Sequence, residues 1–390
     1  MKKKLAFFTP LPPTKSGISD YSVELAYFLK NFFQITFVIS DESQAPTILP
    51  RDTFFLKYKE WRDLKNKKSF ICFYHMGNNI YHDYIYDEIL VNPGVTLFHD
   101  FSLHHLIIER VTSGKLTVED YYRKIYQSLN YNLKSNNKLQ FPIPDLFKFI
   151  VPLNEEVAKS SNKIIVHSNK SYNKFKKIFP KKQILKINFP YKKMDDEQEL
   201  FDVKKNSFGY DDDCLIISIL GFCTPPKQVS FAMKALSRIK IKLKKFKFLI
   251  VGEVHESLNI DKEIKKYNLD KNVEIIGYTD FATFKKYIII SDIILNLRYP
   301  SAGETSAVLL RSLGFGNVNI AFDYESFADF PDDVLVKIPL DTSDTYFLEE
   351  AITRLLDNKT LCDMYKKNSK QHIEHHHDIS EIAKQLNDFL

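Results

Sequence analysis

Short apolar runs alternate with amphipathic stretches along the first half of the chain. Five of these runs predict buried strands, because they are short and rich in aromatic and β-branched residues: 4–9, 34–40, 69–75, 94–100 and 163–168. The segment "SDYSVELAYFLKNFF" between the first two repeats its apolar residues at helical spacing, after a Ser-Asp cap. Apolar strands that alternate with helices predict a parallel sheet covered on both faces.

A second series of the same kind begins near residue 213. The runs "CLIISILG", "KFKFLIVGE", "NVEIIGY", "DIILNL" and "NVNIAFD" predict its strands, and helical patterns separate them. A polar stretch without clear periodicity precedes the series and is interpreted as a linker. We therefore expect two doubly wound α/β domains, Rossmann-like in architecture, over 1–187 and 211–370, with a linker over 188–210. An amphipathic helix within 371–390 is expected to pack back on the first domain.

Composition narrows the class of protein. Hydrophobic residues make up 44% of the 390 residues and charged residues 27%, which is typical of a globular protein long enough for two domains. The net charge of +6 suits an anionic small ligand or membrane surface, and no nucleic-acid recognition pattern is present. Four widely spaced cysteines and an apolar run too short for a signal peptide favour the cytoplasm, at most peripheral to a membrane.

In the predicted first domain, polar residues follow three strands. A Pro-rich loop leads to Gly17 at a helix start, where the backbone can approach a phosphate closely. Asn78 and Asn79 follow the third strand, and their side chains suit sugar hydroxyls or a plain turn. His99 and Asp100 end the next strand, and His104 comes soon after. The spacing of these histidines matches no zinc motif.

In the predicted second domain, two turns are candidates for binding an anion. Gly221 ends a strand, and Lys227 follows two prolines, so a rigid loop holds this cation. The turn "PSAGETS" (300–306) carries Glu304 just before a helix, whose N-terminus offers N–H donors to a phosphate. A capping role for Glu304 is the alternative.

These turns, in this order, resemble those of the retaining glycosyltransferases of family 4, which have the GT-B fold of two Rossmann-like domains facing across a cleft. The resemblance spans almost the whole chain. It implies an acceptor-binding first domain and a nucleotide-sugar-binding second domain. It further implies that His99, Lys227 and Glu304 act in catalysis. The implied donor-binding residues are Gly17, Gly221, Arg298, Gly303, Thr305, Ser306 and Arg311, and the acceptor-binding residues are Asn78, Asn79, Asp100 and His104.

Two positions of the expected donor site depart from the family pattern. Phe222 stands where the family usually has Arg, and Arg311 stands where it has the second Glu of its motif. A branch of the family with "GETS" turns and "TPxK" loops shows the same changes, and Arg298 is a candidate for the missing cation. The nucleotide preference, UDP- or GDP-sugar, depends on these positions.

The expected reaction is transfer of a sugar from a nucleotide diphosphate donor, with retention at the anomeric carbon and without a catalytic metal. The resemblance implies a lipid-linked or surface-polysaccharide acceptor. Basic aromatic segments at 174–182 and 239–248 are candidates for contact with an anionic membrane, or are ordinary solvated faces. The alternative is a catalytically silent GT-B subunit that stabilises or guides a partner. An epimerase on the same fold is a third hypothesis, although no acid pair suited to it is evident.

Overall fold

The structure is a computed structural model and describes residues 2–129, 146–192 and 203–390. The chain forms two compact units. The first contains the residues up to Pro190 together with Ala302–Thr305 and Ile379–Leu390, and the second contains Tyr191–Ser301 and Ser306–Asp378. The linker expected at 188–210 lies partly outside the described residues.

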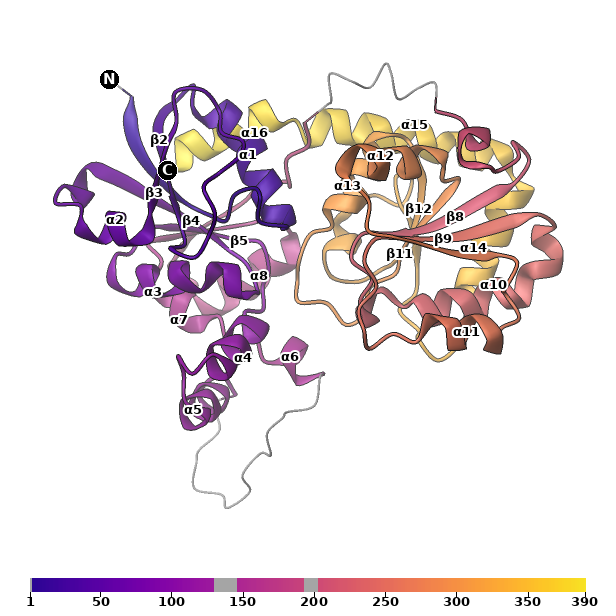
Figure 1. Ribbon diagram of the computed structural model, residues 1–390, viewed down its shortest axis with the longest axis horizontal. Helices are drawn as coiled ribbons and strands as arrows, with labels where there is room; N and C mark the ends of the chain where they lie inside the picture. The colour runs from indigo at the N-terminus through magenta and orange to yellow at the C-terminus, as the bar shows by residue number, and fades with distance from the viewer. Residues whose placement is uncertain (1, 130–145, 193–202) are drawn as a thin grey trace. The chain divides into compact units, whose positions relative to one another are not determined.

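The first unit is built on a seven-stranded parallel sheet in the order β3-β2-β1-β4-β5-β6-β7 (Figure 1). Its strands are β1 (Lys3–Phe8), β2 (Phe33–Ile39), β3 (Phe54–Lys57), β4 (Phe70–Met76), β5 (Val95–Phe98), β6 (Lys163–Val166) and β7 (Gln183–Lys186). Its helices are α1 (Gly17–Leu29), α2 (Tyr58–Asp63), α3 (Asp83–Val91), α4 (His104–Thr112), α5 (Val118–Ser128), α6 (Phe147–Ile150), α7 (Glu155–Ser160), α8 (Asn169–Ile178) and α16 (Ile379–Phe389), with short 3-10 turns η1 (Lys67–Ser69) and η2 (Ile80–His82).

Alternate residues of β1 enter two different hydrophobic cores. Leu5 and Phe7 pack on the side of α1, whereas Ala6 and Phe8 pack on the side of α3 and α4. This period of two is what a strand buried on both faces requires, and it explains why every residue from Leu5 to Phe8 is apolar. The buried strands expected from the sequence at β1, β2, β4, β5 and β6 are confirmed.

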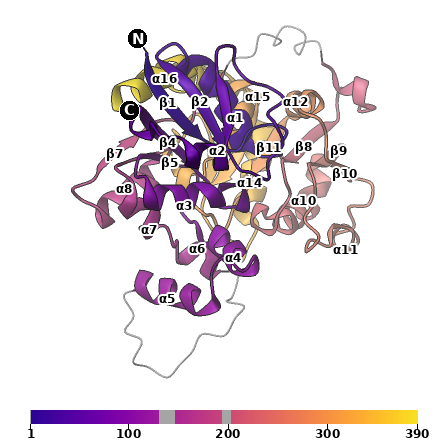
Figure 2. The same ribbon diagram turned by 60° about the vertical axis from the view of Figure 1, so that its left-hand side comes forward.

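The C-terminal helix α16 belongs to the first unit, although α15 before it belongs to the second. Its apolar face joins the same core as α1, and the two helices lie side by side in both ribbon views (Figures 1 and 2). Ile382 and Leu386 are fully buried there or nearly so. Burial of this face accounts for the amphipathic pattern at the end of the chain.

The second unit is built on a six-stranded parallel sheet in the order β10-β9-β8-β11-β12-β13. Its strands are β8 (Leu215–Leu220), β9 (Phe246–Val251), β10 (Val273–Gly277), β11 (Ile293–Asn296), β12 (Val318–Phe322) and β13 (Val336–Ile338). Its helices are α10 (Val229–Leu243), α11 (Ile260–Lys266), α12 (Phe281–Ile290), α13 (Ala307–Gly314), α14 (Tyr346–Asp357) and α15 (Lys359–His376), with 3-10 turns η3 (Lys205–Phe208), η4 (Pro225–Lys227) and η5 (Glu325–Asp329).

Each sheet reverses its strand order once, between β1 and β4 in the first unit and between β8 and β11 in the second. In open α/β sheets, ligands bind beyond the carboxyl ends of the strands at such a reversal, because the flanking loops diverge there. The reversals therefore locate one candidate binding region in each unit. Within the described residues, no helix has the length and hydropathy needed to cross a membrane.

A buried polar network crosses the centre of the second sheet. The side-chain oxygen of Asn319 on β12 accepts hydrogen bonds from the Asn296 amide at 2.8 Å and from the Ser312 hydroxyl at 2.7 Å. Its side-chain nitrogen donates to the carbonyl of Asn317 at 3.0 Å. Asn319 is 1% exposed, so this polar residue is tolerated in the strand because its partners lie inside the core.

We expect Asn319→Ala to destabilise the second unit by about 2 kcal/mol, because it removes three hydrogen bonds from a largely buried network. The matched control is Asn173→Ala, on the exposed face of α8, which should leave the melting temperature unchanged. Thermal unfolding followed by circular dichroism measures both. Equal melting temperatures for the two variants would contradict this account of the network.

Candidate active site

Lys227 lies at the carboxyl end of β8, where the strand order of the second unit reverses. The loop after β8 begins at Gly221, which has a φ of +81°, and continues through the turn η4 to this lysine. The Lys227 ammonium returns to donate a hydrogen bond to the carbonyl of Leu220, the last residue of β8. A Cβ built on Gly221 would lie 3.1 Å from that ammonium, so glycine both adopts the left-handed conformation and leaves room for the lysine.

Arg298 lies in the loop after β11, on the other side of the reversal. Two hydrogen bonds join this loop to the lysine loop: Tyr299 N donates to Pro226 O at 2.9 Å, and Gln228 Nε2 donates to Tyr299 O at 2.6 Å. Burial of the ammonium, and then the positive charge of Arg298, lower the pKa of Lys227 to about 7. Two cations held together in this way favour a bound anion, which would relieve their repulsion.

The helix α13 begins directly after the "PSAGETS" turn. Ser306 is its N-cap, and its hydroxyl accepts a hydrogen bond from Leu309 N at 3.2 Å. The Ser306 hydroxyl thus caps the first turn of the helix. Arg311, further along α13, places its guanidinium 4.8 Å from the centre of the Phe281 ring. This packing gives Arg311 a structural contact in addition to the donor contact predicted for it.

The residues 302–305 are grouped with the first unit. Gly303 has a φ of +83°, and a Cβ on it would lie 2.5 Å from the Cβ of Phe101, so no side chain fits at this position. Glu304 and Thr305 are both partly exposed. The small residue in this turn is therefore explained by close packing, and the roles predicted for the acid and the threonine stay predictions.

His99 lies in a cluster of buried aromatic residues at the carboxyl end of β5. Its ring centre is 4.8 Å from those of Tyr21 and His75 and 5.5 Å from that of His167. Burial, and then the neighbouring imidazoles, hold the pKa of His99 well below its usual range. His99 is therefore neutral near pH 7. Among the described residues, none hydrogen-bonds its buried Nε2.

The polar residues after β4 and β5 mainly form hydrogen bonds within and between their own loops. Asn78 N donates to Asp100 Oδ2 at 2.9 Å, and Asn78 Oδ1 accepts from Leu106 N at 3.1 Å. Asn79 caps the turn η2 by accepting from Tyr81 N at 3.1 Å. These bonds support the turn interpretation of both asparagines, and the acceptor contacts predicted for them and for Asp100 stay predictions.

The environment of His104 disfavours the acceptor contact predicted for it. His104 is fully buried, its Nδ1 lies 2.6 Å from Val151 O, and its Nε2 lies 2.7 Å from the Tyr121 hydroxyl. Both ring nitrogens are thus used within the protein, and the ring joins α4 to α5 and to the chain after α6.

Gly17, in contrast, is the first residue of α1, and a Cβ on it would meet no atom within 4 Å. Its surroundings leave space for a ligand.

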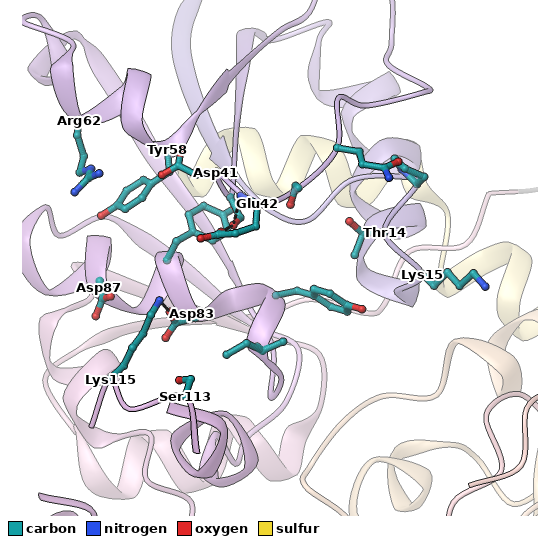
Figure 3. Close-up of a pocket in the computed structure, with 17 residues that line it drawn as sticks. Thr14, Lys15, Asp41, Glu42, Tyr58, Arg62, Asp83, Asp87, Ser113 and Lys115 are labelled. Atoms are coloured by element: carbon teal, nitrogen blue, oxygen red, sulfur yellow. Dashed lines mark hydrogen bonds and ion pairs between the residues drawn. The ribbon is translucent and has the colours of Figure 1, made fainter. Parts of the chain in front are cut away.

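A cavity of about 840 Å³ opens in the first unit beside the strand-order reversal (Figure 3). Sequence reasoning did not find it, because its walls come from loops distant in sequence. The sequence signals that could have pointed to this cavity are the acids Asp41 and Glu42 after β2 and Tyr81 after the asparagine pair. Among the described residues, no group of three or more His, Cys, Asp or Glu is arranged to hold a metal ion. The lining residues after β1, β2 and β4 include Pro13, Thr14, Lys15, Ser40, Asp41, Glu42, Ile80 and Tyr81.

Comparison with known proteins decides the class of the chain. Residues 201–372, most of the second unit, match the model of the family described as "Glycosyl transferases group 1". The chain is therefore a glycosyltransferase. No curated protein matches it in sequence.

Solved structures show that this glycosyltransferase has the GT-B fold. It resembles sucrose-phosphate synthase from Thermosynechococcus elongatus with a TM-score of 0.72 and 12% identity, over 99% of this chain and 98% of that chain. It resembles WaaG, a glycosyltransferase involved in lipopolysaccharide biosynthesis, with a TM-score of 0.64 and 14% identity, over 99% of each chain. It also resembles Anabaena HepE in complex with UDP-glucose, with a TM-score of 0.65 and 10% identity, over 99% of this chain and 98% of that chain.

The lowered pKa of Lys227 predicts that nucleotide-sugar binding takes up a proton. Near pH 8 the free lysine is mostly neutral, and a bound diphosphate favours its charged form, so uptake should approach about one proton and fall toward zero at about pH 5.5. Titration calorimetry in buffers of different ionisation enthalpy measures this uptake. Lys227→Arg is the control, since arginine stays protonated and should abolish the uptake. Equal proton uptake in the variant would contradict the prediction that Lys227 takes up the proton.

Proposed function

We propose that the glycosyltransferase binds the diphosphate of a nucleotide sugar at the strand-order reversal of its second unit. One observation carries the proposal: the ammonium of Lys227 is held against Leu220 at the end of β8, with Arg298 beside it. The family match over the same unit supports this position for the donor, and the HepE complex with UDP-glucose makes a UDP-sugar the first candidate.

The chemical role of the site follows from where charge develops. As the glycosidic bond to the diphosphate breaks, negative charge grows on the leaving phosphate and positive charge on the sugar. Lys227 and Arg298 are fixed by their loops before the reaction, so they stabilise the leaving group without reorganisation. The N-terminus of α13 adds backbone N–H donors at its first turn.

We further propose retention at the anomeric carbon by front-face attack. The leaving phosphate takes the proton of the acceptor hydroxyl, and no catalytic metal is used. The neutral imidazole of His99 is suited to a hydrogen bond with a sugar hydroxyl, and the carboxylate of Glu304 is suited to accept such bonds and to favour a cationic centre. Gly17 leaves room for the donor near the start of α1.

The acceptor and location are proposals of the same kind. We propose that the first unit binds the acceptor, a lipid-linked or surface-polysaccharide intermediate. We also propose that the enzyme acts in the cytoplasm, at the inner face of the membrane. Four free cysteines agree with a reducing compartment. The exposed Ile241, flanked by Lys240 and Lys242 near the end of α10, is a candidate for membrane contact.

Two features favour the alternative, a silent subunit. Phe222 is 52% exposed where the family usually has a cation, and Arg311 packs on Phe281 where the family has an acid. A silent subunit would bind neither donor nor acceptor productively. Slow hydrolysis of a nucleotide sugar by the purified chain, in the absence of any acceptor, separates the two hypotheses.

We expect Lys227→Ala to lower kcat for transfer, or for this hydrolysis, by about 10²–10³-fold, because one fixed cation at the leaving group is lost. Lys234→Ala on α10 is the control and should keep the wild-type rate. Release of the nucleoside diphosphate measures both rates. Turnover by the Lys227 variant within a few-fold of wild type would overturn the proposed site.

We expect Glu304→Gln to keep the fold and nucleotide affinity but to lose most sugar transfer. The amide preserves the size of the side chain and one acceptor oxygen, while the charge that favours a cationic transition state is removed. A capping role predicts the reverse, a stability loss of about 1 kcal/mol or less with nearly intact activity. Melting temperature, nucleotide Kd and kcat of this variant together distinguish the two roles.

A further inference from the structure

The cavity shown in Figure 3 lies at the carboxyl ends of three neighbouring strands of the first unit. Pro13–Lys15 follow β1, Ser40–Gln44 follow β2, and Ile80 and Tyr81 follow β4. This is the side of the sheet where the strand order reverses, which is where open α/β sheets bind ligands. Its volume of about 840 Å³ falls in the range of small-molecule sites.

An ion-pair network lies along one wall of the cavity. Asp83 pairs with Arg110 at 2.7 Å and with Lys115, and Arg110 also pairs with Asp87 at 2.7 Å. Figure 3 shows Asp83, Asp87 and Lys115 together along one wall. Because the side chains of Arg110 and Asp83 are almost fully buried, these bonds fix the wall in place. A ligand thus meets a rigid surface whose charges are already compensated.

The opposite wall carries Asp41 and Glu42. Asp41 Oδ1 accepts from Lys59 N at 2.8 Å, and the Glu42 carboxylate accepts from the Ser40 hydroxyl. The Ser40 bond is the main cause that lowers the pKa of Glu42, and Lys115 contributes to the same direction. Glu42 is therefore ionised near pH 7, and the remaining lone pairs of both acids are acceptors for hydroxyl donors.

Three tyrosines give the cavity aromatic surface. The Tyr58 hydroxyl donates to Glu88 at 3.0 Å, and Arg62 stacks 5.1 Å from its ring centre. The Tyr84 hydroxyl donates to Val38 O at 2.8 Å, so hydrogen bonds fix the orientation of the Tyr58 and Tyr84 rings. Tyr81 is 44% exposed at the cavity, which leaves its ring free to cover the apolar face of a ligand.

We propose that this cavity binds an uncharged sugar unit of the acceptor. The inference rests on the proposed function and names the acceptor chemistry. A sugar has an apolar C–H face, which suits an aromatic ring, and a rim of hydroxyls, which suits carboxylates and backbone carbonyls. The lining contains four carboxylates against three cations, and Arg110 behind the wall balances the fourth carboxylate, so the cavity offers no excess positive charge to a phosphorylated or uronic sugar. The four lining acids are Asp41, Glu42, Asp83 and Asp87, and the three cations are Lys15, Arg62 and Lys115.

The test uses the full chain on an array of neutral, uronic-acid-containing and phosphorylated oligosaccharides. The neutral oligosaccharide that binds most strongly is then titrated by calorimetry. We expect Tyr81→Ala to weaken its binding about tenfold, because truncating an aromatic residue at the centre of a site removes a large share of the affinity. Tyr81→Phe should bind like wild type. Tyr346→Ala, at another exposed tyrosine, on α14, is the matched control and should also bind like wild type.

Three outcomes would overturn the proposal: a preference for the charged glycans, no neutral glycan bound by wild type, or equal binding by Tyr81→Ala and wild type. Hydrolysis of UDP- or GDP-sugar is measured on the same proteins, and Tyr81→Ala should retain it. Glycan binding that depends on Tyr81, without any hydrolysis by wild type, would support the cavity while contradicting the proposed function. The two failures are therefore distinguishable.

Discussion

The hydrogen bond from the Lys227 ammonium to the Leu220 carbonyl is the interaction on which the proposed donor site depends. It holds a cation at the carboxyl end of β8, where the glycine after the strand leaves no side chain in the way. Enclosure beside Arg298 destabilises the charged form of the lysine, so the site is poised to gain from an anion. The energy needed to hold the two cations together is supplied by folding, and binding of the proposed diphosphate would recover it.

The same topological constraint operates in both units. A parallel sheet that reverses its strand order opens a crevice at the reversal, and the loops on either side supply the functional groups. In the second unit these loops carry Lys227 and Arg298, which suit an anion. In the first unit they border a cavity with tyrosines and compensated carboxylates, which suit a polyhydroxylated ligand. One architecture thus provides two chemically different candidate sites.

The central strands could be predicted from sequence because burial on both faces makes them continuously apolar. The edge strands β3 and β7 could not, since each has four residues and exposed or half-exposed side chains, as at Phe54. The lysine loop was predictable from its Gly and Pro residues, which act locally. The burial of His104 and the Figure 3 cavity were not, because both depend on segments brought together only by the fold.

The central claim is that the second unit binds a nucleotide diphosphate sugar, and a thermal-shift panel tests it most directly. UDP-, GDP-, ADP- and CMP-sugars are added separately to wild type and to Lys227→Ala. Ligand at about a hundredfold over its Kd stabilises the folded state by about 2.7 kcal/mol. The account predicts that a UDP- or GDP-sugar raises the melting temperature of wild type and does so much less in the variant. No shift with any diphosphate sugar, or equal shifts in both proteins, would contradict it.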